Sequence, residues 1–577
     1  MRAGRRLPFY VPASPSQTYQ YLPMKADREI RLLYLEPRSS KSRLSCSLRI
    51  VPLSKTPFYE ALSYTWGKPV FPASMKCSPS GQLCITENLS VALCHLRLKD
   101  RIRVLWVDAI CINQQDNVER SQQVSSMRDI YEGADHVVVW LGKDNGNAKM
   151  AFERVQDAAE VTDRVWKPGV FGVLRRIRGP EEEAALDNLL KRGWFQRIWV
   201  IQELVCAGKA TIMCGNQSME WERFQGFVGR LYEDGNYNRV AVNDPVYNLI
   251  QMRRENEQRR LGKQSSLLYL LSAFRSCEAS DPRDKIFALV GIADQQTIAA
   301  CTPDYSKDVS EIYSNLASHL IITERNADIL AFCVAPHKGQ HLPLPSWVPD
   351  WSRPQINNAS PRSMPGAYKA SAGTSFKGRI DSNTLSLDGV MLNRVVILGG
   401  GEESYEIFKQ SRNYAQRDLT AYVRTLVADV GDKHRLERQQ LLLFCTRYCK
   451  DPLIMTQIQN REFLDTWPKF LNTEIKNFYN SIHDPKKPTI EENLHNALHD
   501  AATGRMFCLF DDSHVGWVPW SAEVGDRIAI FLGGTVPILL RPSGNDYIVL
   551  GEAYVDEMMD GQAFEEPEIQ VETITLI

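Results

Sequence analysis

Residues 104–112 read VLWVDAICI, an apolar run interrupted only by Asp108. Runs of this kind are typical of strands that are covered on both faces, as in parallel sheets flanked by helices. Residues 59–67 (YEALSYTWG) and 136–142 (HVVVWLG) are also rich in apolar side chains, and each ends at a glycine. We therefore predict that these three segments are strands of one sheet.

Helical patterns separate the predicted strands. Residues 88–98 and 117–132 each carry an apolar stripe at helical spacing. A further helix is predicted over residues 194–207, before a short strand at 210–214. Strands that alternate with helices favour right-handed crossovers and parallel pairing. The sequence thus predicts an α/β domain with an open, mainly parallel sheet.

Polar residues follow two of the predicted strands and are candidates for ligand binding. Ser63, Tyr64 and Trp66 close the first strand, and Asp108 and Asn113 follow the second. Ligands of open α/β sheets bind beyond the carboxyl ends of the strands, which is where these residues are expected. Two alternatives stay open: the residues after the first strand can pack beneath the next loop, and Asp108 can cap a loop by accepting backbone N–H bonds.

The predicted helix over residues 194–207 supplies a candidate acid. Trp199 and Glu203 are four residues apart, so both are expected on one side of the helix, beside the stripe that faces the core. A carboxylate next to an indole could act on a ligand in the neighbouring crevice. The alternative is that Glu203 forms a structural ion pair with an arginine while Trp199 is part of the core.

The chain of 577 residues is too long for one ordinary domain. We predict a flexible tail over residues 1–27, whose prolines prevent a targeting helix, and the α/β domain over 28–230. Residues 231–375 have mostly helical patterns. Residues 376–577 alternate apolar stretches with turn residues, which predicts a small β domain, and a polar helical insertion interrupts it at about 402–503.

The composition narrows the classes of function. The 68 Lys and Arg residues balance 69 Asp and Glu residues, and a net charge of −1 provides no positive field for binding nucleic acid. The 13 scattered cysteines indicate reduced thiols and a cytoplasmic location. The apolar runs are too short for a membrane span. Phosphate-binding loops, GxSxG elbows and HExxH zinc motifs are absent, so neither a metal site nor a bound cofactor is expected.

Four ordered segments resemble a known family, the heterokaryon incompatibility (HET) domain of filamentous fungi. They are residues 59–67 (YEALSYTWG), 105–120 (LWVDAICINQQDNVER), 123–142 (QVSSMRDIYEGADHVVVWLG) and 192–204 (RGWFQRIWVIQEL).

The resemblance continues beyond these four segments. Residues 281–292 (DPRDKIFALVGI) and 344–352 (LPSWVPDWS) are similar to segments that commonly follow the HET domain, and residues 516–542 are similar to the family's usual tail. Two departures are present. Lys68 stands where many relatives have an acid, and residues 554–562 lack a common His-Gly pair.

The resemblance implies a role in non-self recognition and programmed cell death when incompatible fungal cells fuse. The HET family is distantly similar to Toll/interleukin-1 receptor (TIR) domains, some of which cleave NAD with a glutamate that follows a tryptophan by four residues. By this resemblance Glu203 would be the catalytic carboxylate and NAD a substrate rather than a cofactor. The implied crevice is lined by Ser63, Tyr64, Trp66, Asp108, Asn113 and Trp199.

The resemblance to TIR domains also implies activation by assembly, either as a homo-oligomer or with another incompatibility protein. The alternative function is a non-catalytic module that signals through protein–protein association. Both functions fit a TIR-like α/β domain in the cytoplasm.

Overall fold

The computed structural model divides the chain into two compact units. The N-terminal unit comprises Met1–Val240 with Asp244–Lys307, and the C-terminal unit comprises Ala241–Asn243 with Asp308–Ile577. The structure describes residues 18–24, 28–38, 43–79, 81–164, 180–233, 245–259, 265–294, 301–335, 342–353, 368–399, 505–511, 514–555, 558–565 and 569–577. The predicted insertion at 402–503 lies outside these residues, as does most of the predicted tail.

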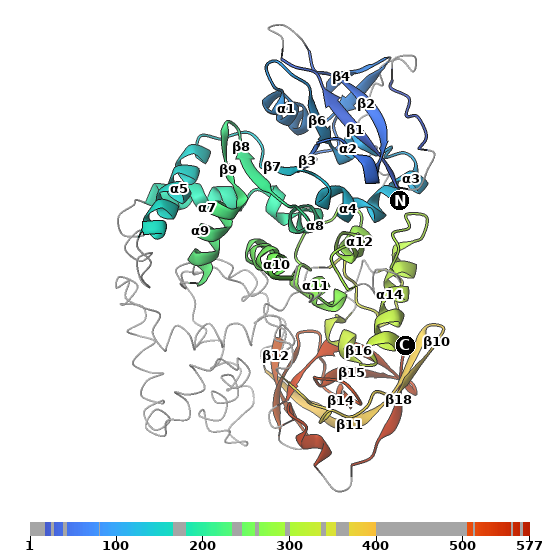
Figure 1. Cartoon of the computed structure of the whole chain (residues 1–577). Coiled ribbons are helices and arrows are strands. Elements are labelled where there is room, and N and C mark those ends of the chain that lie inside the picture. Colours follow the sequence, from blue (N-terminus) through green and yellow to red (C-terminus); the bar gives the residue numbers. More distant parts are fainter. Residues whose placement is uncertain are drawn as a thin grey trace, which may run out of the picture. The chain divides into compact units, whose positions relative to one another are not determined.

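A nine-stranded sheet forms the centre of the N-terminal unit, in the order β5-β4-β2-β1-β6-β3-β7-β8-β9. Figure 1 shows these strands in blue to green. Their bounds are β1 Glu29–Leu35, β2 Ser45–Pro52, β3 Glu60–Tyr64, β4 Ala73–Ser78, β5 Gln82–Ile85, β6 Arg103–Trp106, β7 His136–Trp140, β8 Ala210–Cys214 and β9 Gln217–Glu220.

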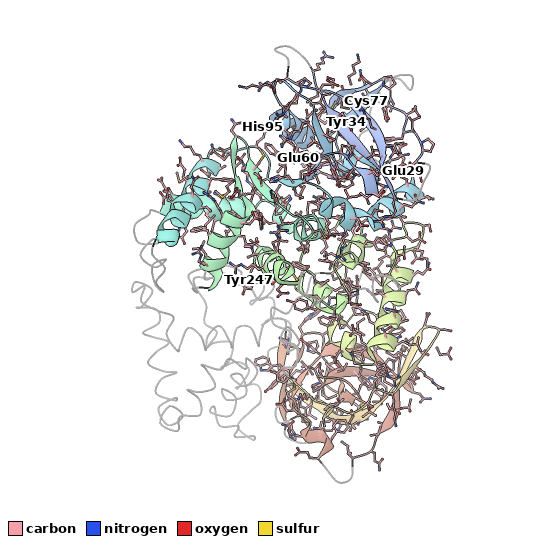
Figure 2. The ribbon with its side chains drawn as sticks, viewed as in Figure 1. Glu29, Tyr34, Glu60, Cys77, His95 and Tyr247 are labelled. Atoms are coloured by element: carbon pink, nitrogen blue, oxygen red, sulfur yellow. The ribbon has the colours of Figure 1, made fainter. Side chains whose placement is uncertain are left out.

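The sheet is mixed, and the prediction of a mainly parallel sheet is wrong. The four central strands β6, β3, β7 and β8 are parallel, as are β2 and β4. The pairs β1–β2, β1–β6, β4–β5 and β8–β9 are antiparallel. Short connections join β1 to β2, β4 to β5 and β8 to β9, and a short connection permits only antiparallel pairing. Figure 2 labels Glu29 and Tyr34 on β1 and Cys77 on β4, within this flanking part.

Helices connect the parallel strands. The helix predicted from Trp194 begins later, because Gly193–Gln196 form a 3-10 turn and α8 starts at Trp199. Asp116 caps α3 by accepting from the backbone N–H groups of Val118 and Glu119. The helices of this unit are α1 Glu87–Leu96, α2 Asp108–Cys111, α3 Asn117–Ser125, α4 Met127–Glu132, α5 Ala148–Arg164, α7 Pro180–Leu190, α8 Trp199–Val205, α9 Trp221–Glu233, α10 Pro245–Arg259, α11 Leu267–Ala273 and α12 Asp284–Val290.

The strand order places a topological switch point between β3 and β7. After β3, β4 and β5 the chain forms β6 on one side of β3, and it then crosses to β7 on the other side of β3. Such a reversal directs the two connections to opposite faces of a sheet and leaves a crevice at the carboxyl ends of the two strands. Any ligand of this unit is therefore expected at the carboxyl end of β3, beside Tyr64.

The C-terminal unit holds a second nine-stranded sheet. Pairing of β11 with both β14 and β18 closes the strands β14, β15, β16, β18 and β11 into a ring. Closure of this kind removes sheet edges. The elements are α14 Val309–Glu324, β10 Gly378–Asp381, β11 Thr384–Gly399, β12 Arg505–Phe510, β13 Val515–Pro519, β14 Arg527–Phe531, β15 Ile538–Ser543, β16 Asp546–Glu552, β17 Tyr554–Val555 and β18 Glu572–Leu576.

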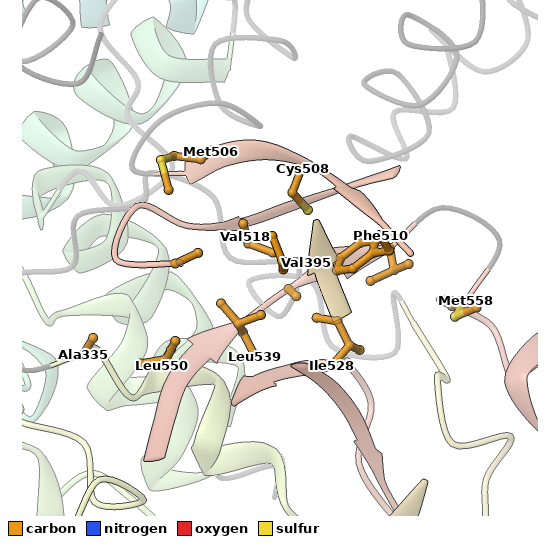
Figure 3. Packing of buried hydrophobic residues seen from close by; sticks show 13 residues of the cluster. Ala335, Val395, Met506, Cys508, Phe510, Val518, Ile528, Leu539, Leu550 and Met558 are labelled. Atoms are coloured by element: carbon orange, nitrogen blue, oxygen red, sulfur yellow. The ribbon is translucent and has the colours of Figure 1, made fainter. Parts of the chain in front are cut away.

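Buried side chains of the β strands form the core of this second unit. Val395 of β11, Cys508 of β12 and Leu539 of β15 are fully buried and belong to one cluster, which Figure 3 shows from close by. Met506, Phe510, Ile528 and Leu550 are also part of it. This packing agrees with the prediction of a C-terminal β structure.

Candidate functional site

The candidate residues lie at the carboxyl ends of the neighbouring parallel strands β3 and β6. Ser63 and Tyr64 are the last residues of β3, and Trp66 follows two positions later. Asp108 is the first residue of α2, directly after β6. Glu203 lies on α8, which packs against β3. The structure therefore brings together residues that are up to 140 positions apart in the chain.

Glu203 is buried inside this cluster. Only 1% of its surface is exposed, and Ser63, which is fully buried, donates a hydrogen bond from its hydroxyl to the Glu203 carboxylate. The Trp194 indole nitrogen donates to the same hydroxyl oxygen at 2.8 Å. Trp194, Ser63 and Glu203 thus form a chain of buried hydrogen bonds, which orients the carboxylate.

The surroundings of Glu203 make its charged form costly. Burial raises the pKa of Glu203 to about 7, because the carboxylate loses its hydration. The positive charge of Arg197 opposes this rise in pKa, whereas the negative charge of Asp108 adds to it. The hydrogen bond from Ser63 lowers the pKa. Near neutral pH this acid is divided between its neutral and ionised forms.

Asp108 forms the outer part of the cluster and is half-buried. The Trp66 indole nitrogen donates to Asp108 Oδ2 at 2.8 Å, and the backbone N–H of Ala109 donates to Oδ1 at 2.7 Å. Burial raises the pKa of Asp108, while Arg197 and the hydrogen bond from Trp66 lower it. Asp108 therefore combines the two roles left open by the sequence, since it contacts a crevice residue and also binds a backbone N–H of its own helix.

One cation serves both carboxylates. The Arg197 guanidinium donates to the backbone carbonyl oxygen of Tyr64, and its charge lowers the pKa of Asp108 and of Glu203. With both acids ionised, the cluster of two carboxylates and one guanidinium is net negative. Perturbed acids gathered in this way at a crevice are typical of functional sites.

The Tyr64 side chain adds a buried hydroxyl to the cluster. It is 1% exposed, and its hydroxyl forms a hydrogen bond with the Asp108 carboxyl, which lowers the pKa of Asp108. Burial raises the pKa of Tyr64 well above its ordinary value, and the nearby negative charge of Asp108 raises it further. Tyr64 therefore belongs to the hydrogen-bonded cluster around Asp108.

Trp199 and Asn113 do not join the cluster. The Trp199 indole is instead a hydrogen-bond donor to Asp284 of α12, and it lowers the pKa of that carboxyl. Asn113 belongs to the turn before α3, where its backbone N–H donates to Glu119 Oε1 at 2.6 Å. Its side-chain oxygen accepts from the backbone N–H of Gln115 at 3.3 Å, so Asn113 stabilises the turn.

Two residues of the cluster were not predicted as site residues. Trp194 was expected only at the start of a predicted helix, on the stripe that faces the core, and Arg197 carried no expectation, although it lies six positions before Glu203. The alternative of an arginine partner for Glu203 was the available signal for Arg197. That alternative did not specify which arginine would be the partner. The position of Arg197 beside Glu203 depends on the 3-10 turn before α8, which the sequence did not predict.

The described residues contain no group of three or more His, Cys, Asp or Glu side chains that could hold a metal ion. Among the helices of the described ranges, none is long and apolar enough to cross a membrane.

These features define a two-unit protein, in which an α/β domain with a polar switch-point site is combined with a closed β domain. Residues 59–203 match the family model of the heterokaryon incompatibility protein (HET), and residues 474–570 match that of the Het-6 beta-barrel domain. Residues 59–203 thus form a HET domain and residues 474–570 match the Het-6 barrel, which confirms the resemblance to the heterokaryon incompatibility family seen in the sequence.

One curated relative is similar over nearly the whole chain. It is heterokaryon incompatibility protein 6, OR allele, of Neurospora crassa, and it is 25% identical. The alignment covers 92% of this chain and 94% of the relative. No solved structure matches this chain. The HET-domain match and this relative support a role in fungal non-self recognition.

Proposed function

We propose that this protein acts in fungal non-self recognition and in the cell death that follows it, and that its N-terminal unit does so in the cytoplasm by cleaving NAD at the Glu203 site. The observation that carries the proposal is the pair of perturbed carboxylates, Asp108 and Glu203, beside the carboxyl ends of the neighbouring strands β3 and β6. The resemblance to TIR domains, in which a glutamate serves this reaction, suggests the substrate.

The chemistry of NAD fits a net negative site. Nicotinamide is cationic in NAD and leaves as a neutral base when its bond to the ribose breaks, so that no acid has to supply a proton. The ribose then carries positive charge, as in glycoside hydrolysis. Ionised Glu203 would stabilise that charge and Asp108 would favour the cationic ring. Water would then add to the ribose carbon and release one proton to the solvent.

The resting arrangement is closed around Glu203. A carboxylate that is 1% exposed and bound by Ser63 does not contact a ribose in this arrangement. The proposal therefore includes an opening step, and assembly of several N-terminal units is the proposed trigger. The partner would be a second copy or another incompatibility protein.

The test uses the full chain fused to a chemically inducible dimerisation domain. On addition of the dimeriser, NAD consumption is expected to rise, and Glu203→Gln is expected to reduce it by at least about 100-fold, as is typical for loss of a group that acts on the reacting atoms. The matched control is Glu60→Gln. Glu60 is the first residue of β3, whereas Ser63 lies near the end of that strand, and Glu60 binds Arg103 at 2.5 Å (Figure 2).

A second candidate function is a non-catalytic module that signals by association. The burial of Glu203 favours it, because an internally satisfied carboxylate can serve only to order β3 and α8. Expression in fungal cells separates the candidates. Cell death that persists in Glu203→Gln, together with no NAD loss in the dimerised wild type, would leave association as the function.

A further inference from the structure

Residues from outside the matched HET segment contact both ends of α8, the helix that carries Glu203. The match ends at residue 203, whereas these contacts come from residues 245–305 of the same unit. A helix of seven residues satisfies few of its own terminal backbone groups, so its position depends on partners supplied by other elements.

Arg253 of α10 binds the carboxyl-terminal end of α8. It is 3% exposed, and its guanidinium donates to the carbonyl oxygen of Leu204 at 2.9 Å and to that of Ala207. A second nitrogen lies 3.3 Å from the carbonyl oxygen of Gly208. A cation at this end also interacts favourably with the helix dipole.

Backbone pairing and Asp284 hold the amino-terminal end. The backbone N–H of Ile198 donates to the carbonyl of Glu278 at 3.0 Å. The carboxylate of Asp284, the first residue of α12, accepts from the Trp199 indole at the start of α8 and from the Tyr305 hydroxyl at 2.6 Å. Asp284 is 6% exposed, so these donors replace water at a buried acid.

The same acid is tied to the β6–β7 connection. The Arg120 guanidinium of α3 lies 3.6 Å from the centre of the Tyr305 ring and 3.9 Å from Asp284 Oδ1. Asp284 therefore joins α3, which follows the strand bearing Asp108, to the start of the helix bearing Glu203. These are the connections on either side of the candidate site.

We propose that Arg253 and Asp284 are positioning residues, which clamp α8 at its two ends and hold Glu203 in the closed arrangement. Release of the clamp at Asp284 would admit water and ligand to Glu203. The inference rests on the proposed function in taking Glu203 as the functional group, and its test uses no NAD, so the two can fail separately.

Asp284 is the end of the clamp that we expect to release. Burial raises the pKa of Asp284, which means that its ionised form depends on the Tyr305 and Trp199 donors. Trp199 is half-buried, whereas Arg253 is almost wholly enclosed. Neither Asp284 nor Trp199 is among the groups that shift the pKa of Glu203 directly. A change in that pKa on their substitution therefore reports movement of α8.

The experiment measures the pKa of Glu203 in the folded full chain by NMR with carboxyl-¹³C-labelled glutamate. The Glu203 signal is assigned by its loss in Glu203→Gln. The wild type is expected to titrate at about 7. In Trp199→Phe and in Asp284→Asn, the pKa is expected to fall toward the ordinary value of 4.5 as water reaches the carboxylate. Arg253→Met should have the same effect, and Arg253→Lys should restore part of the wild-type value.

The matched control is Trp347→Phe in the C-terminal unit. It also removes a buried indole donor, which binds the Asn383 carbonyl at 2.9 Å. Hydrogen exchange of β3 and β7 amides verifies that the N-terminal unit stays folded. A Glu203 pKa that remains at about 7 in folded Trp199→Phe, Asp284→Asn and Arg253→Met would overturn the proposal. The residues would then support the fold without controlling access to Glu203.

Discussion

The hydroxyl of Ser63 donates a hydrogen bond to the carboxylate of Glu203, although the two residues are 140 positions apart. Ser63 ends the central strand β3, and Glu203 lies in the middle of α8. The contact joins the sheet to the helix at the switch point and also determines how readily the acid is charged. The Ser63–Glu203 hydrogen bond therefore affects both the packing of α8 on the sheet and the proton affinity of Glu203.

Replacing Ser63 with alanine removes a donor to Glu203 and an acceptor for Trp194. Because the Ser63 hydrogen bond lowers the pKa of Glu203, Ser63→Ala is expected to raise that pKa above about 7. The free energy of unfolding should fall by about 1–3 kcal/mol, because the Trp194 N–H is left buried without its partner. Carboxyl NMR and hydrogen exchange of β3 amides measure the two effects. Ser125→Ala, at an exposed position on α3, should change neither. A lowered pKa in Ser63→Ala would contradict the prediction.

Glu203 makes the stability of the N-terminal unit depend on pH. Its pKa is about 7 when folded and ordinarily 4.5, so the folded state binds more protons between these values. Stability is therefore lost as the pH rises from 4.5 through 7, by about 3 kcal/mol at most. Glu203→Gln lacks this loss and should gain stability relative to the wild type between pH 5 and pH 8. Hydrogen exchange of β3 and β7 amides at the two pH values measures the difference. If the wild type and Glu203→Gln differed in stability by the same amount at pH 5 and at pH 8, Glu203 would have its ordinary pKa in the folded state, which would contradict the prediction.

Arg31 and Glu119 form a buried ion pair at 2.5 Å between β1 and α3. The Arg31 guanidinium also donates to the carbonyl oxygens of Cys111 and Leu22, at 3.1 and 2.6 Å. Arg31→Met leaves the Glu119 charge buried alone and should cost about 3–5 kcal/mol. The double variant Arg31→Met, Glu119→Leu should recover most of this loss, because it leaves no isolated charge. Urea-dependent hydrogen exchange of β1 amides measures both. Equal costs for the single and the double variant would show that the carbonyl contacts dominate.

Arg541 of β15 has two acidic partners that differ in burial. Asp526 is 2% exposed and accepts from two guanidinium nitrogens at 2.9 and 3.0 Å. The Glu523 side chain is 70% exposed at 3.0 Å. Asp526→Asn should destabilise the C-terminal unit by about 3 kcal/mol or more, because a desolvated charge loses its partner. Glu523→Gln should cost less than about 1 kcal/mol, since water screens an exposed pair. Hydrogen exchange of β14 amides compares the two, and similar costs would refute the prediction.

The central part of the fold could be predicted because its signals are local. The apolar runs at 59–67, 136–142 and 210–214 correspond to β3, β7 and β8, whereas the run at 104–112, predicted as one strand, forms the short strand β6 and then the helix α2. The flanking strands gave weaker signals. In β4, for example, buried and exposed residues alternate over a short polar segment, a pattern that many loops share. The sheet was therefore predicted as mainly parallel, and its antiparallel flanks were missed.

The candidate site shows the same division. The strand ends predicted that Ser63, Tyr64, Trp66 and Asp108 lie near one another, and the helical pattern added Glu203; the structure shows the contacts Ser63–Glu203 and Trp66–Asp108. Helical spacing does not specify which neighbour each side chain contacts. For that reason Trp199, which was expected beside Glu203 in the crevice, lies against Asp284. The catalytic and binding roles of these residues stay predictions.

By itself, the sequence determined the family, the parallel centre of the sheet and the strand ends where polar residues gather, because motifs and apolar runs depend only on residues that are near in the chain. Only the tertiary structure decided that Glu203 is buried and that Arg197 is the cation beside it. The physical reason is that burial and proton affinity depend on which atoms surround a side chain. For Glu203 those atoms come from β3, α2 and the turn before α8, and no local sequence pattern specifies that these three elements lie next to Glu203.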